Sequence, residues 1–140
     1  MSEDIVARCG AIEECYEYLL AYAAQGLSGE GPSQSGGQLR VFLSRAVDAL
    51  TGMAEAYAGV VKEEGLQPAE RYDGFLAVLK RDAQDTLAIV ELVLSQPVLS
   101  SQLIDNLNAS IHFRALLTDL FLIDELLKLH RLAANPAAAN

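Results

Sequence analysis

Apolar side chains recur every three or four residues along four long segments of the chain, and no segment alternates apolar and polar residues as a strand does. The first two segments run from about 3 to 25 and from about 38 to 64. The other two run from about 69 to 95 and from about 101 to 132. Because each repeat can bury one stripe of a helix, the pattern predicts four amphipathic helices.

The links between these segments favour a bundle. Residues 26–37 are rich in Gly and Ser, so we expect a flexible loop there, and residues 134–140 are expected to fray. Ser100 or Ser101 is placed to cap the fourth helix. We therefore predict an all-α fold, an antiparallel four-helix bundle formed by one domain over residues 1–140.

Composition narrows the classes of partner. The chain carries 19 acidic and 10 basic residues, a formal net charge of −9, and it is 51% hydrophobic. Because nucleic acids and anionic membranes bind clustered Lys and Arg, we expect neither as a partner. The start of the chain lacks the basic and apolar segments of a secretory signal, and the apolar windows are too short or too charged to cross a bilayer. We expect a cytoplasmic protein.

Two cysteines, Cys9 and Cys15, lie six residues apart on the first predicted helix. On one helix they are separated by about 9 Å along the axis and point in different directions, so they cannot bridge each other. An intermolecular disulfide or a redox switch is one interpretation. We favour two reduced thiols.

The fourth segment carries more apolar surface than one stripe requires. One arc contains Ile104, Leu107, Ile111, Ala115, Leu122, Leu126 and Leu129; a second contains Leu116, Leu120, Ile123 and Leu127. The end of the third segment is also apolar nearly all round. Since exposed apolar patches of several hundred Å² are unusual on monomers, we predict a homodimer. The predicted interface is Leu116, Leu120, Ile123, Leu127, Ile89 and Leu92.

A polar stripe lies between the two arcs. It contains Asp105, Asn108, His112 and Asp119, and we expect it to be partly buried. Carboxylate and imidazole groups in such a place occur at metal and general-base sites, but they also fix helix register through hydrogen bonds. Asn106, Asn108 and Ser110 are weak helix formers, which favours a kink or short break nearby.

The acidic residues of two other helices suggest an alternative. Glu13, Glu14 and Glu17, with Asp82 and Asp85, are the carboxylates available to a divalent metal. All-helical nucleotide pyrophosphohydrolases carry Glu-rich helix motifs that hold magnesium, but this chain fits that pattern loosely. A solvated acidic face is the simpler interpretation. We predict no metal and no cofactor.

No arrangement of residues predicts a catalytic group. The leading hypothesis is a non-enzymatic protein that acts through protein–protein contacts, as an adaptor, a chaperone or a regulatory subunit. Its partners are a second copy of itself and another protein. A divalent-metal-dependent enzyme and a bundle that binds a small apolar ligand remain the alternatives.

Overall fold

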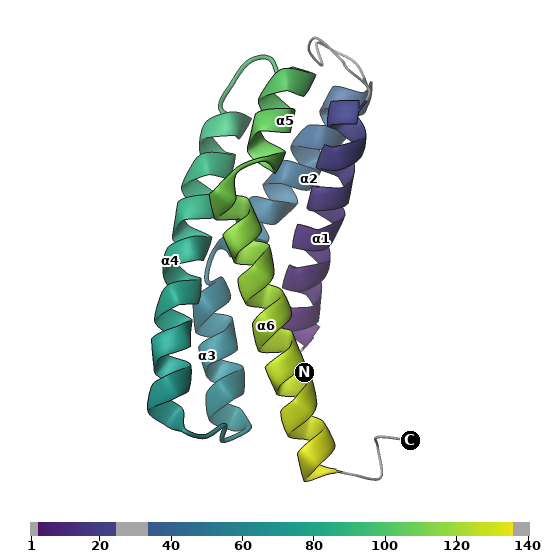
Figure 1. Ribbon diagram of the computed structural model, residues 1–140. Helices are drawn as coiled ribbons and strands as arrows, with labels where there is room; N and C mark the ends of the chain where they lie inside the picture. The colour runs from purple at the N-terminus through teal and green to yellow at the C-terminus, as the bar shows by residue number, and fades with distance from the viewer. Residues whose placement is uncertain (1–2, 25–33, 136–140) are drawn as a thin grey trace.

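The computed structural model describes residues 3–24 and 34–135 (Figure 1). This part of the chain is all-helical and contains six helices and no strand. Helix α1 spans Glu3–Ala24, α2 Gln34–Leu50, α3 Met53–Glu63, α4 Ala69–Leu94, α5 Ser101–Asn108 and α6 Ile111–Ala134. The prediction of an all-α fold is confirmed for these residues.

The predicted number of helices is wrong, because two of the four segments are interrupted. The segment 38–64 is α2 and α3 with a break at Thr51 and Gly52, and the segment 101–132 is α5 and α6 with a break at Ala109 and Ser110. Helix α2 begins at Gln34, inside the predicted loop 26–37; the rest of that loop lies outside the described residues, as does the predicted tail beyond Asn135.

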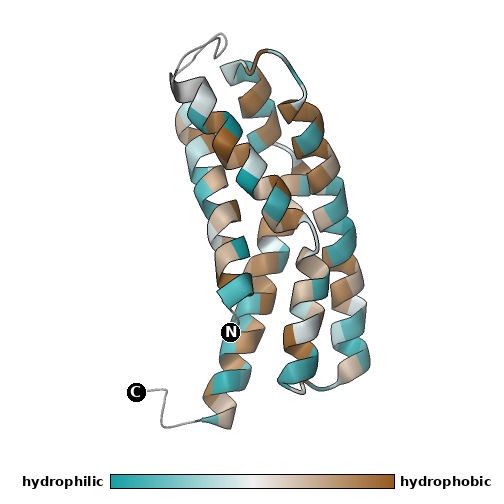
Figure 2. Ribbon diagram, turned by 180° about the vertical axis from the view of Figure 1, so that it is seen from behind, coloured by the Kyte–Doolittle hydropathy of each residue, from teal (hydrophilic) through white to brown (hydrophobic). Residues whose placement is uncertain are grey.

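The helices lie side by side along one long axis (Figure 1). Helix α1 packs against α2 and α5, whereas α4 packs against α2, α3 and α6. Polar and apolar positions are interleaved along the helices, as Figure 2 shows. Among the residues described, no helix combines the length and the apolar character that crossing a membrane requires.

The break between α5 and α6 decides which apolar arc faces the core. Ile104 of α5 and Leu116 of α6 are both fully buried. On one continuous helix they would point about 120° apart, so a straight helix could not bury both. Ser110 makes the change of direction by capping α6: its Oγ accepts a hydrogen bond from the His112 amide at 3.2 Å. Ser100 caps α5 in the same way, as predicted.

Arginines satisfy the carbonyl groups left unpaired at helix ends. Arg40 of α2 donates to the carbonyl oxygens of Leu94, Gln96 and Pro97 at the end of α4, at 2.9 to 3.2 Å. Arg8 of α1 donates to those of Ala49 and Thr51 at the end of α2. Arg114 Nε donates to the Asn108 carbonyl, which closes α5.

Gly52 completes the break that Arg8 stabilises. Its φ of 77° lies in the left-handed region, where a side chain is disfavoured. The helical spacing of core residues nevertheless continues across it, from Leu50 to Met53 and Tyr57, all of which are buried. Helices α2 and α3 therefore share one apolar seam although their backbones are separate.

Candidate functional site

The predicted dimer interface is mostly part of the core. Leu116, Leu120, Ile123 and Leu127 are at most 3% exposed, so their own chain covers them and a second copy cannot reach them. Ile89 is partly buried on α4. Of the residues assigned to the interface, only Leu92, at 65% exposed, projects into solvent.

The other apolar arc of α6 faces solvent instead. Ile111, Leu122 and Leu129 are 75%, 50% and 52% exposed. Ala115 and Leu126 fall on the same side of the helix and are partly buried. We call these five residues the α6 stripe. It lies nearly opposite the side of α6 that enters the core, and three of its five side chains are at least half exposed.

The predicted polar stripe is not one site. Asp105 is exposed on α5, whereas Asn108 is 5% exposed at the end of that helix. No hydrogen-bond partner for the Asn108 side-chain amide is found among the described residues. His112 and Asp119 lie on α6, beyond the break. The break separates these four residues, which a continuous helix would align.

Two members of the polar stripe meet aspartates of α4. His112 Nδ1 lies 3.9 Å from Asp85 Oδ2, and both side chains are about half exposed. The Asp119 carboxyl lies beside that of Asp82. Burial, together with this second carboxyl group, raises the pKa of Asp119 to about 7. Both contacts lie between α4 and α6, and no hydrogen-bond partner for the buried Asp119 Oδ2 is found among the described residues.

The pH dependence of folding tests the contact between Asp82 and Asp119. Because the pKa of Asp119 is about 7 in the fold and 3.8 ordinarily, the folded state binds its proton more tightly. The contribution of Asp119 to the free energy of unfolding is therefore fully present below about pH 4 and is lost as the pH rises through 7. We expect Asp119→Asn to add about 1 kcal/mol to the free energy of unfolding at pH 8, and almost nothing at pH 4. Urea unfolding at both pH values measures this. Asp105→Asn, at an exposed position, is the control and should leave the free energy of unfolding unchanged at both pH values.

The proposed metal ligands do not converge. Glu13, Glu14 and Glu17 are exposed on α1, while Asp82 and Asp85 face α6 from α4. In the part of the chain that the structure describes, no group of three or more His, Cys, Asp or Glu residues could hold a metal ion.

A buried polar cluster of three helices was not predicted from the sequence. The Tyr57 hydroxyl of α3 donates to Asp124 Oδ1 of α6 at 2.7 Å. Cys9 Sγ of α1 lies 2.9 Å from the same hydroxyl and 3.7 Å from Asp124 Oδ2. The tyrosine proton points to Asp124 Oδ1, and the Cys9 thiol donates toward Asp124 Oδ2, so both groups direct a proton at the same carboxylate. Asp124 lies among core positions of α6. A charged residue on the apolar side of a predicted helix is the sequence signal that could have revealed this cluster.

Both cysteines are free and buried. Burial raises the pKa of the Cys9 thiol to about 11 and that of Cys15 to about 12. Both thiols are therefore protonated near neutral pH, which makes them poor nucleophiles. The Cys9 cluster holds α1, α3 and α6 together and offers no reactive group.

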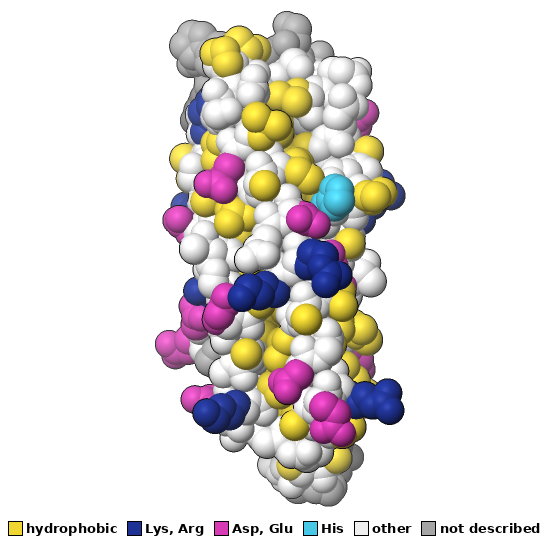
Figure 3. All heavy atoms as spheres, turned by 90° about the vertical axis from the view of Figure 1, so that its left-hand side faces the viewer, with side chains coloured by type: hydrophobic (Ala, Val, Ile, Leu, Met, Phe, Trp, Pro, Cys, Tyr) yellow, Lys and Arg dark blue, Asp and Glu magenta, His cyan; other side chains and the backbone are white. Residues whose placement is uncertain are grey.

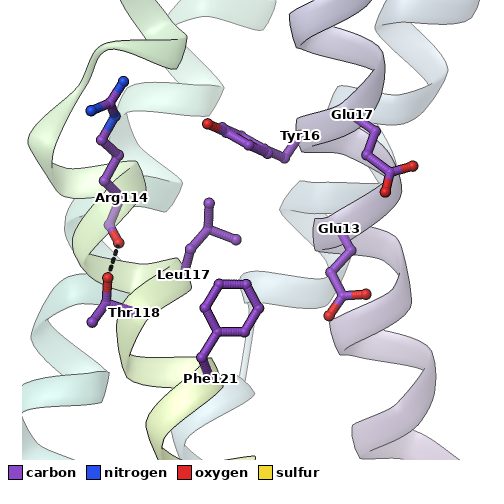
Figure 4. Close-up of a pocket in the computed structure, with 7 residues that line it drawn as sticks. All are labelled: Glu13, Tyr16, Glu17, Arg114, Leu117, Thr118 and Phe121. Atoms are coloured by element: carbon purple, nitrogen blue, oxygen red, sulfur yellow. Dashed lines mark hydrogen bonds between the residues drawn. The ribbon is translucent and has the colours of Figure 1, made fainter.

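A groove runs between α1 and α6 (Figure 4). It has a volume of about 660 Å³ and is lined by Glu13, Tyr16, Glu17, Arg114, Leu117, Thr118 and Phe121. Tyr16 extends from α1 toward α6, and Leu117 and Phe121 extend from α6 toward α1, while the two glutamates lie on the α1 side (Figure 4). The groove thus has an apolar floor and one acidic wall.

Comparisons with known proteins give no further guide to the site. No protein-family model matches the chain, and no curated protein or solved structure is significantly similar to it.

Proposed function

We propose that this protein is a non-enzymatic interaction module that associates with a second copy of itself through the α6 stripe. The observation that carries the proposal is the exposure of Ile111, Leu122 and Leu129 on the side of α6 turned away from the core. Ala115, Leu122 and Leu129 recur at seven-residue intervals, the spacing with which paired helices bury their seam. In this proposal α2 with α3, and α5 with α6, each form one interrupted rod, so the six helices make an antiparallel bundle of four rods. The protein acts in the cytoplasm.

The stripe is complementary to itself in an antiparallel arrangement. A two-fold axis near residue 120 places Ile111 of one copy against Leu129 of the other. The same axis brings Arg114 beside Glu125, which lie on one edge of the stripe with opposite charges. A single register of the two helices therefore pairs the apolar residues with each other and the opposite charges with each other.

Helix α4 extends the proposed surface. Leu92 follows Asp85 by seven residues, so it lies on the side of α4 from which Asp85 meets His112. Exposed apolar residues on this side of the molecule stand among charged ones (Figure 3). A specific interface buries about 1,200 Å² or more, and an apolar centre with a charged rim is its usual composition.

Leu122→Asp is expected to weaken the dimer at least tenfold, because it places a charge at the centre of the stripe. Sedimentation equilibrium should give the native protein about twice its 15.0 kDa chain mass at high micromolar concentration, and the variant a single chain mass. Leu20→Asp is the matched control: Leu20 is 47% exposed on α1, and its replacement should leave the dimer intact. A native protein that stays at one chain mass contradicts the proposal.

A charge swap tests the register. Arg114→Glu and Glu125→Arg should each weaken association, and the double variant should restore it, because the pair is rebuilt with its charges exchanged. If the double variant associates more weakly than either single variant, this register is excluded, although the dimer is not.

A further inference from the structure

The groove between α1 and α6 lies beside the α6 stripe, and Arg114 both lines the groove and stands at the edge of the stripe. Phe121, which lies at its edge and is 60% exposed, turns toward α1 (Figure 4), and Leu122 of the stripe is 50% exposed. Phe121 also lines a second hollow of about 600 Å³, which continues along α6 past Asp124 to Leu132. That second hollow is also lined by Lys128 and Arg131 and by no residue of α1, so the acidic wall belongs to the first hollow.

The floor of the groove is apolar and packs against the core. Leu117 is 8% exposed, so only its edge reaches the groove. The Tyr16 ring packs against Phe113 of the core, with ring centroids 5.8 Å apart. An apolar side chain inserted between Tyr16 and Phe121 would cover surface that this chain leaves to water.

Negative charge on the α1 wall has no partner within the described residues. Glu13 and Glu17 are exposed, and neither forms an ion pair there. They stand four residues apart, so they are neighbours on one side of α1. The cation across the groove, Arg114, is engaged by the Asn108 carbonyl through Nε.

We propose that this groove binds an amphipathic helix of another protein, one with an apolar face and two basic residues four positions apart. The apolar face covers Leu117 and Phe121, and the basic residues pair with Glu13 and Glu17, whose spacing they share. A second copy of this chain is a poor occupant, because its sequence has no two basic residues four positions apart. The proposal does not depend on the dimer.

A synthetic helical peptide provides the probe. It carries a Leu and Ala face, two Lys residues four apart and one Trp; the protein has no Trp, so Trp fluorescence reports only the peptide. A control peptide has Glu in place of both Lys. We expect the Lys peptide to bind at least tenfold more tightly, and its advantage to shrink as salt screens the charges. Equal binding of the two peptides, or no binding of either, overturns the proposal.

Variants of the protein locate the binding surface. Glu13→Lys with Glu17→Lys should weaken the Lys peptide at least tenfold, and Phe121→Ala should weaken both peptides. Glu14→Lys is the matched control, because Glu14 is exposed on the same helix but does not line the groove. Leu122→Asp should bind the peptide normally, which separates this result from that of the dimer experiment. Equal losses in the Glu14 variant and the double variant would place the peptide elsewhere and refute the assignment.

Discussion

Leu116→Ala is expected to lower the free energy of unfolding by about 3 kcal/mol, whereas Leu122→Ala lowers it by less than about 0.5 kcal/mol. The two leucines lie six residues apart on α6, but Leu116 is fully buried and Leu122 is 50% exposed. Removing the Leu116 side chain leaves a cavity among packed neighbours, while the site of Leu122 opens to solvent.

Urea unfolding at low protein concentration measures this difference, because association then contributes little to stability. Leu127→Ala, at another fully buried position, should resemble Leu116→Ala. A larger loss for Leu122 than for Leu116 would mean that the stripe and the core have exchanged places, and the proposed dimer would lose its basis.

Tyr57→Phe should lower the free energy of unfolding by about 2 kcal/mol. The ring stays in the core, but Asp124 loses the hydroxyl that donates to it at 2.7 Å, and the Cys9 thiol loses its nearest partner. Leaving a partly buried carboxylate short of a donor costs more than one ordinary hydrogen bond contributes.

Tyr72→Phe is the control for this experiment, because Tyr72 is only partly buried and makes no side-chain hydrogen bond in the described structure. Replacing both Tyr57 by Phe and Asp124 by Asn should recover part of the loss, since the charge is then absent. A Tyr57→Phe protein as stable as the Tyr72→Phe protein would show that the cluster does not stabilise the fold.

Local patterns were sufficient to predict the helical class and several helix ends. The predicted start at Glu3 and the predicted range 69–95 agree with α1 and α4 to within one residue at each end. The break near Ser110 was expected from weak helix formers. The break at Gly52 was not, because buried residues keep helical spacing across it and only one glycine marks the position.

The side of α6 that enters the core could not be predicted from periodicity. Both arcs are apolar, and Ile104 and Leu107 of α5 suggested that the arc continuing from them was the core. The break removed that relation, so the arc assigned to a partner is buried and the other arc is exposed. The clusters around Tyr57 and Phe121 join helices far apart in sequence, and no local spacing predicts such contacts.

The two-residue break at Ala109 and Ser110 also determines where this chain tolerates a change in length. A residue added within α6 would turn everything after it by about 100° and move buried leucines toward water. A residue added at the break leaves the rotation of each helix unchanged, since the α5 and α6 ladders of hydrogen bonds end on either side of it. Because of this short link, an insertion in one of the two helices does not change which side chains of the other helix face the core.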